Sequence, residues 1–248
     1  MKESNFTYIY DGTWEDLLKV ISWLFKEKRK PFQIIEESQY ENNLLSPPFK
    51  PVINKENVID KKYIPKEVLK ISYYVFLSNE KDKELIIYYF LLNSLKYQKN
   101  VLYMRNLKCV NKALTISKRV SREAHKWKGF LRFKEIQNHI FYAEFTADNN
   151  ILGILANHFK KRLPKERWII KDEKRDILCL YDQKNCYFLD GKEIELDLKQ
   201  NTEEKNMEEL WKSFFKTVAI KERLNKKCQQ NFMPKKYWKN ILEMEDEQ

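Results

Sequence analysis

The order of apolar and polar residues predicts that the chain opens with a strand and a helix. Residues 6–10 (FTYIY) are aromatic or β-branched, a composition typical of strands. In the turn that follows, Asp11 or Thr13 can cap a helix over 14–28, whose leucines and isoleucine recur at helical spacing. The apolar residues of 32–35 predict a second strand.

Three helices are predicted between residues 65 and 127. After an irregular, proline-containing loop over 42–54, Pro65 is suited to the first turn of a helix. Ser78 is expected to cap the second helix, over 81–97. The third helix, over 107–127, has an apolar stripe and an outer face that carries Lys108, Lys112, Lys118, Arg119, Arg122 and Lys126. Such a face can lie along a phosphate backbone.

Beyond residue 128 the hydrophobic period shortens to the two-residue alternation of strands. The expected elements are a hairpin of strands over 129–136 and 139–146, a helix over 149–163 capped by Asp148, and strands over 167–171, 176–181 and 186–189. Further helices are expected over 207–226 and 234–244. The pattern predicts an α+β protein, in which a helical lobe is followed by a β-β-α-β-β-β antiparallel sheet unit and C-terminal helices.

No flexible linker marks a domain boundary, so we expect the 248 residues to form a single compact unit with two lobes. Residues 1–127 would form a mainly helical lobe with an N-terminal strand, 128–191 the antiparallel sheet unit, and 192–248 a helical tail. At this length, a chain that is 43% hydrophobic can bury a sizeable core.

Composition excludes several classes of enzyme. The chain has four glycines, no two of them close together, whereas dinucleotide-binding folds and P-loop NTPases need clustered glycines around phosphates. The four cysteines form no C-x-x-C pair and the three histidines do not complete a zinc site, so we expect reduced, buried thiols, no metal and no cofactor. The sequence also lacks the short motifs of serine and zinc hydrolases, and whether the chain is an enzyme stays open.

No segment has the pattern of a membrane anchor or a secretion signal. The N-terminal residues lack the apolar core of a signal peptide. The longest apolar run, 85–92 (LIIYYFLL), is far shorter than the roughly 20 residues that span a bilayer. We therefore expect a cytoplasmic protein without a membrane partner.

Positive charge is concentrated in the middle of the chain. The formal net charge is +11, and 19 basic residues stand against 7 acidic ones between Lys99 and Arg175, while the remainder is close to neutral. Seven of the nine arginines lie in this stretch, interleaved with aromatic residues. A codon bias toward lysine would spread charge evenly, so the concentration favours a surface that contacts phosphates and stacks on bases. The alternative is a solvated, lysine-rich face that binds nothing.

The residues expected to contact nucleic acid are mostly basic: Arg119, Arg122, Lys126, Arg132, Arg162, Arg175, Arg223, Lys227 and the aromatic Trp168. Arg132 is expected on one face of its strand, beside Lys134. The basic run from Arg223 and the aromatic pair Tyr237–Trp238 form either a nucleic-acid arm or a segment that packs back onto the core.

Four residues are candidates for acid–base or phosphate chemistry. His158 and Arg162 share one helix face, where they either relay a proton and bind a phosphate or complement the helix dipole. Asp172 ends a strand, where it either forms an Asx turn or orients the guanidinium of Arg162 or Arg175. His125 is a further candidate general acid or base.

Five segments between Tyr8 and Trp238 carry a family resemblance: YIYDGTWEDLL, FLSNEKDKE, EAHKWKGFLRF, HFKKRLPKERWIIKDEKR and RLNKKCQQNFMPKKYW. Together they resemble a bacterial family of unknown function whose members are described as DNA metabolism or DNA repair proteins. Members of that family occur alone or fused ahead of a uracil-DNA glycosylase domain. A radical SAM protein assigned to DNA modification or repair is often their genomic neighbour.

The resemblance implies a role in DNA metabolism without established catalytic residues. Lys171 stands where many relatives have histidine, which weakens an enzymatic interpretation, and Lys236 stands where arginine is usual. Glycosylase activity is not carried over, since the 248 residues do not include that domain. We therefore expect an accessory protein that binds duplex or single-stranded DNA. The alternatives are a DNA-processing enzyme that uses His158, Arg162 and Asp172, and a scaffold that binds the radical SAM protein.

Overall fold

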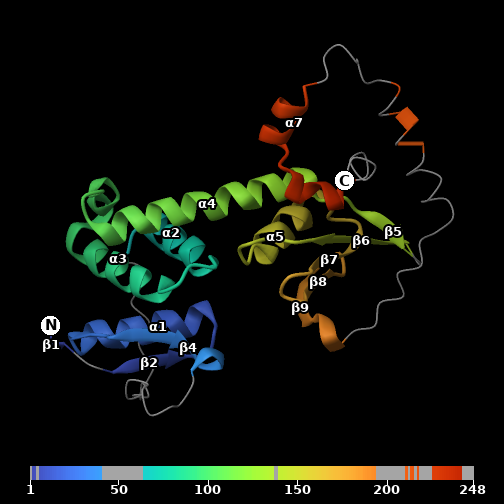
Figure 1. Cartoon of the computed structure of the whole chain (residues 1–248). Coiled ribbons are helices and arrows are strands. Elements are labelled where there is room, and N and C mark those ends of the chain that lie inside the picture. The colour runs from blue at the N-terminus through green and yellow to red at the C-terminus, as the bar shows by residue number, and fades with distance from the viewer. Residues whose placement is uncertain are drawn as a thin grey trace. The chain divides into compact units, whose positions relative to one another are not determined.

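A computed structural model shows the chain as two compact units, residues 1–121 and 122–248. It describes residues 2–3, 6–40, 64–136, 139–193 and 225–241, together with single positions between 210 and 217. Helices and sheets are both present, so the predicted α+β class is confirmed (Figure 1). The division of a single unit at residues 127 and 191 stays a prediction. The loop expected over 42–54 and most of the helix expected over 207–226 lie outside the described residues.

Unit 1 opens with a small β-α-β arrangement. Its elements are β1 (Lys2–Glu3), β2 (Thr7–Tyr10), α1 (Trp14–Lys26), β3 (Arg29–Lys30), β4 (Gln33–Glu36) and the 3₁₀ helix η1 (Glu37–Gln39). Strand β2 pairs in parallel with β4, and β1 with β3, because α1 returns the chain to the same end of the strands. Gly12 makes the turn before α1 with a φ of +87°. Thr13 caps the helix by accepting a hydrogen bond from the backbone N–H of Asp16, as expected.

Unit 1 continues with helices, several of which contact α1 or one another. They are α2 (Lys66–Phe76), α3 (Lys83–Tyr97), the 3₁₀ helix η3 (Gln98–Tyr103) and the first part of α4 (Lys108–Phe130). Fully buried side chains include Leu17, Ile21, Leu24, Val68, Ile87 and Phe90. The expected cap at Ser78 is wrong. Its hydroxyl donates to the carbonyl of Val75 at 2.6 Å, at the end of α2, and α3 begins only after Asp82.

Helix α4 is longer than the hydrophobic pattern predicts. It continues to Phe130, and the N–H of Leu131 still donates to the carbonyl of Trp127 at 3.0 Å. The strand expected over 129–136 is therefore reduced to β5 (Lys134–Ile136). Arg132 consequently lies in the connection between helix and strand rather than on a strand face, and its guanidinium donates to the carbonyl of Gly129 at 2.8 Å.

Unit 2 contains a five-stranded sheet in the order β5-β6-β7-β8-β9. The further elements of this region are β6 (Ile140–Phe145), α5 (Leu152–Arg162), β7 (Arg167–Asp172), β8 (Ile177–Tyr181), β9 (Cys186–Asp190) and the 3₁₀ helix η5 (Gly191–Glu193). The sheet is mixed, so the antiparallel expectation is wrong for one pair: β6 and β7 run parallel. Helix α5 connects them as a crossover and returns the chain to the starting end of the sheet.

The two faces of the sheet in unit 2 bury different side chains. Trp168, Ile170 and Asp172, at alternate positions of β7, are buried together on one face. Helix α5 lies against β7 and β8 (Figure 1). The ring of Phe133 packs against both Phe159 of α5 and Trp168. The other face carries a smaller cluster made of Ile136, Tyr142, Ile169 and Leu178.

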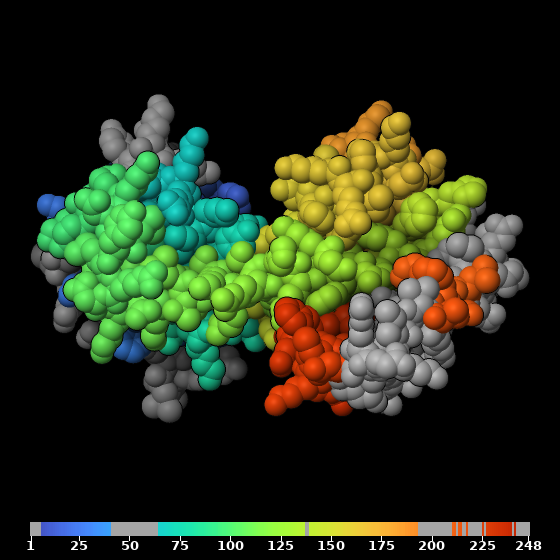
Figure 2. Space-filling model, turned by 90° about the horizontal axis from the view of Figure 1, so that it is seen from above, coloured from blue at the N-terminus to red at the C-terminus, as the bar shows by residue number. Residues whose placement is uncertain are grey.

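The described C-terminal residues end in α7 (Lys226–Phe232) and the 3₁₀ helix η7 (Lys235–Asn240). The helix expected over 234–244 is thus a 3₁₀ helix that begins after Pro234. Residues 225–241, here called the tail segment, lie against the carboxyl-terminal part of α4 (Figure 2). Tyr237, Trp238 and Ile241 are buried in unit 2.

Candidate functional site

Helix α4 has one buried face and one exposed, basic face, as its hydrophobic pattern predicts. Val110, Ala113, Val120 and Trp127 are fully buried. The exposed face carries Lys108, Lys112, Lys118, Arg119 and Arg122, which we call the α4 basic face. Lys126 continues this line but is half-buried, with its ammonium group 5.7 Å from the centre of the Tyr237 ring. Five cationic groups thus stand in water on one side of a single helix.

The charge of this face is largely uncompensated. The sequence between residues 98 and 122 contains seven basic residues and no acidic one. Arg119 forms an exposed ion pair with Glu80, which follows α2. Within the described residues, Lys108, Lys112, Lys118 and Arg122 have no ion-pair partner. A row of five cations with one carboxylate partner creates a positive potential that attracts polyanions.

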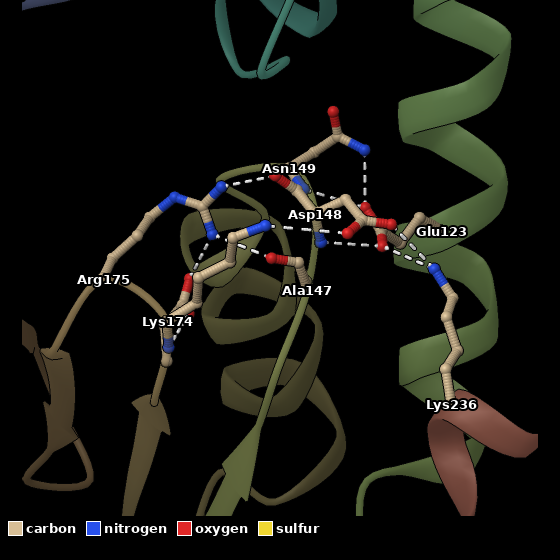
Figure 3. Close-up of polar contacts among 8 residues, drawn as sticks. Glu123, Ala147, Asp148, Asn149, Lys174, Arg175 and Lys236 are labelled. Atoms are coloured by element: carbon tan, nitrogen blue, oxygen red, sulfur yellow. Dashed lines mark hydrogen bonds and ion pairs between the residues drawn. The ribbon is translucent and has the colours of Figure 1, made fainter.

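A second group of functional side chains forms a polar network in unit 2 (Figure 3). Its centre is Glu123 on α4, which is only 6% exposed. The Glu123 carboxylate accepts hydrogen bonds from the backbone N–H groups of Asp148 and Asn149, each at 3.0 Å, and from the side-chain amide of Asn149. Because a buried carboxylate is costly without partners, these donors fix the loop between β6 and α5 onto α4.

Arg175, which follows β7 of the sheet, binds the same loop between β6 and α5. Its guanidinium donates to the carbonyls of Ala147 (3.2 Å) and Asp148 (2.7 Å) and to the carboxylate of Asp172 (2.9 Å) (Figure 3). Asp172 also accepts a hydrogen bond from the backbone N–H of Lys174 at 3.1 Å, which makes the Asx turn predicted for it. The ion pair forms with Arg175, and Arg162 takes no part in it.

Burial raises the pKa of Asp172 above its ordinary value, although the Arg175 guanidinium and the backbone N–H groups oppose this. Three of the Arg175 donor groups are occupied by acceptors within the protein. Arg175 therefore serves to hold the loop before α5, which weakens the expectation that it binds a phosphate.

Asp148 does not cap α5, contrary to expectation. The helix begins at Leu152, and no side chain caps its N-terminus. The Asp148 carboxylate instead accepts a hydrogen bond from the Lys236 ammonium group at 2.8 Å. It also lies 3.7 Å from the ammonium group of Lys174. Lys236 also reaches the carboxylate of Glu123, at 3.5 Å. The hydrogen bond from Lys236 lowers the pKa of Asp148 below its ordinary value.

The tail segment is held by rings as well as charges. Tyr237 packs edge-on against Trp127, with 5.1 Å between the ring centres, and the indole N–H of Trp238 donates to the carbonyl of Met233 at 2.8 Å. Of the two expectations for this pair, packing onto the core is confirmed. Lys227 is exposed, and Arg223 lies outside the described residues.

The candidate acid–base residues do not form one cluster. His158 is half-buried near the carboxyl end of α5, and its Nε2 atom is buried without a hydrogen-bond partner. Burial, together with the nearby charges of Lys128 and Arg162, lowers its pKa. Asp172 lies at the other end of α5, since its partner Arg175 binds the loop that precedes this helix. His125 is exposed on α4.

Two further expectations are corrected by burial. Trp168 is fully buried and stacks on Tyr181, with 4.9 Å between the ring centres, so its ring is not available to a base. All four cysteines are free thiols, but only Cys179 is buried, since Cys109 and Cys186 are half-buried and Cys228 is exposed. Within the described residues, no group of three or more His, Cys, Asp or Glu side chains is arranged as a metal site.

Sequence analysis missed two features. Glu123 gave no signal of its role, because its partners lie 25 and 26 residues away in the chain. Tyr103, the last residue of η3, is 84% exposed, which no pattern in the sequence indicates. The lack of acidic residues between 98 and 122 was the feature of the sequence that could have drawn attention to Tyr103.

The described structure is thus of the α+β class, with a buried polar network in unit 2 and a basic face on α4. Residues 81–243 match the model of a family described as a domain of unknown function, DUF4130. The match covers more than half of the chain, so the chain belongs to this family. No curated protein and no solved structure matches it. No helix in the described part of the chain has the length and apolar character that a bilayer crossing requires.

Proposed function

We propose that the protein is a DNA-binding accessory protein in DNA repair or modification, and that it contacts the phosphate backbone through the α4 basic face. The observation that carries the proposal is the row of exposed lysines and arginines, of which only Arg119 forms an ion pair among the described residues. Lysine and arginine contacts to phosphates supply most non-specific affinity for DNA. The family resemblance to DNA metabolism proteins agrees with this role.

The geometry of a helix suits a backbone contact. Lys108 and Arg119, both in unit 1, are 11 residues apart, or about 16 Å along a helix axis. The basic residues between them stay on one side because the opposite side is buried. A row of this length can contact successive phosphates, and each neutralised phosphate adds about −0.9 to the slope of log K against log salt.

The test is a titration of fluorescein-labelled DNA at several salt concentrations, followed by fluorescence anisotropy. The variant K108Q/K112Q/K118Q should weaken binding and reduce the salt slope by about 2–3. The matched control is K28Q/K66Q/K70Q, which removes the same charge from exposed lysines of unit 1 that lie outside the face. Absence of salt-dependent binding by the native protein, or equal losses in both variants, would overturn the proposal.

The alternatives make different predictions. A scaffold that binds an acidic protein such as the radical SAM neighbour would retain its partner after nuclease treatment, whereas a DNA contact would not. The enzymatic alternative has less support, because His158 and Asp172 lie at opposite ends of α5. If His158 acts as an acid or base, H158A abolishes turnover while DNA affinity is kept.

A further inference from the structure

Tyr103 is the most exposed large hydrophobic side chain among the described residues. It ends the 3₁₀ helix η3, and 84% of its surface is open to solvent. Most surface tyrosines cover part of their ring with a neighbour. Among the described residues, the ring of Tyr103 has no aromatic or cationic partner. An apolar face of this size in water is a candidate contact surface.

The backbone beneath this ring is well fixed. Val101, two residues earlier, is fully buried. The carbonyl of Val101 accepts a hydrogen bond from the N–H of Met104, and the carbonyl of Tyr103 accepts one from the N–H of Arg105, each at 3.0 Å. These bonds hold η3 and the turn before α4 in one conformation. A ring presented from a fixed backbone loses little entropy when a ligand stacks on it.

The surroundings of Tyr103 are positively charged. Lys99 and Arg105 are exposed on either side of it, and Lys108 begins α4 five residues later. Within the described residues, none of these three cations forms an ion pair, and the chain between residues 98 and 122 contains no acidic residue. An exposed aromatic ring and several cations therefore occur on one short stretch of unit 1.

We infer that Tyr103 is a stacking platform for an unpaired base, and that the amino end of the α4 basic face binds single-stranded nucleic acid. The inference rests on the proposed function and specifies its substrate. Aromatic rings that alternate with cations are the usual means of binding single strands without reading their sequence, because every base has a π-face. In a duplex the bases are stacked on one another and cannot reach an external ring, so a duplex would use the cations alone.

The experiment compares Y103A with Y103F in anisotropy titrations. The probes are a labelled ten-nucleotide thymidine strand, the ribonucleotide strand of equal length, a duplex with the same number of phosphates, and an abasic strand. Y103A should weaken binding of either single strand by about 5- to 100-fold, and Y103F should restore it. Y103A and Y103F should bind the abasic strand with nearly equal affinity, and the same should hold for the duplex. Tyr187→Ala, at an exposed tyrosine of β9, is the matched control.

The outcomes separate this inference from the proposed function. If Y103A binds the single strands as the native protein does while K108Q/K112Q/K118Q is impaired, the stacking site is refuted and the DNA contact stands. If Y103A weakens the abasic strand as much as the thymidine strand, the ring has only a structural role and the inference also fails. If the native protein binds none of the four probes at low salt, the proposed function fails.

Discussion

The carboxylate of Glu123 accepts a hydrogen bond from the backbone N–H of Asn149 at 3.0 Å. The contact joins the carboxyl-terminal part of α4 to the loop that leads from the sheet into α5. With a second bond from the N–H of Asp148, both oxygens of one buried carboxylate satisfy backbone donors that no helix or strand could satisfy. Unit 2 therefore depends on a charged residue at its centre as well as on its apolar core.

Replacing Glu123 should be strongly destabilising. Glu123→Gln keeps the size of the side chain but turns one acceptor oxygen into a donor that faces backbone N–H groups. We expect unfolding in urea, followed by circular dichroism, to show a loss of about 2–4 kcal/mol. Glu166→Gln, at an exposed position, is the control and should change stability by less than about 0.5 kcal/mol. Equal stability of the two variants would contradict a central role for Glu123.

Replacing Arg175 by lysine should lower the stability of the fold. Arg175→Lys keeps the charge, but a single ammonium group cannot reach the two carbonyls and the Asp172 carboxylate that the planar guanidinium joins. A loss of about 1–3 kcal/mol is expected in the same denaturation assay. Arg167→Lys replaces an exposed arginine at the start of β7 and should have little effect. A native-like R175K would mean that charge alone holds the loop.

Trp238 should anchor the tail segment mainly through packing. Trp238→Ala removes a ring that is 4% exposed and should cost about 3–5 kcal/mol. Trp238→Phe keeps most of the packing but loses the hydrogen bond to the carbonyl of Met233. The lost hydrogen bond should lower the free energy of unfolding by about 1 kcal/mol, in addition to the effect of the smaller ring. Phe232→Ala, at a ring that is 75% exposed, serves as the control. Limited proteolysis of the tail segment should increase in the order of these losses.

The contact of Lys236 with Asp148 predicts that the stability of the fold decreases at acidic pH. The hydrogen bond from Lys236 lowers the pKa of Asp148, and in Glu173 bonds from Thr146 and Lys239 outweigh the effect of burial and lower its pKa as well. A carboxylate whose pKa is lower in the folded state stabilises the fold at pH values above its unfolded pKa of about 4. That contribution is lost as the pH falls through the folded pKa.

Urea midpoints measured between pH 5 and pH 3 should therefore fall with pH, and Asp148→Asn should make the fall shallower. Asp190→Asn, at an exposed aspartate of β9, is the comparison. An unchanged slope in D148N would show that the ion pair is too exposed to contribute.

Periodicity was sufficient to predict most elements of the fold. The stripe of Leu17 and Ile21 located α1, and the alternation around Ile170 located β7, but Trp168 was expected to contact nucleic acid and is buried instead. The spacing of apolar residues does not determine whether two strands pair in parallel or antiparallel, so the parallel arrangement of β6 and β7 was missed. The capping errors have a local cause: Ser78 and Asp148 are good caps, but α3 and α5 begin several residues later.

The candidate site was less predictable, because its properties depend on burial and long-range contacts. Trp168 and Tyr103 are both aromatic residues in a basic region, yet one is fully buried and the other is 84% exposed. Asp172 had two equally good partners in sequence, and only the fold places Arg175 beside it. The lysines of the α4 basic face were predicted correctly as exposed, because one periodic helix determines their side.

The position of Ile241 and Trp238 in the core of unit 2 has a consequence for biosynthesis. Unit 1 is complete once residue 121 has left the ribosome, whereas the hydrophobic centre of unit 2 stays open until residue 241 emerges. Until then, the apolar residues that Trp238 and Ile241 cover in the folded chain stay open to solvent in the nascent one. A ribosome stalled before Trp238 would hold an aggregation-prone intermediate, which makes this stage the one at which chaperone assistance matters most.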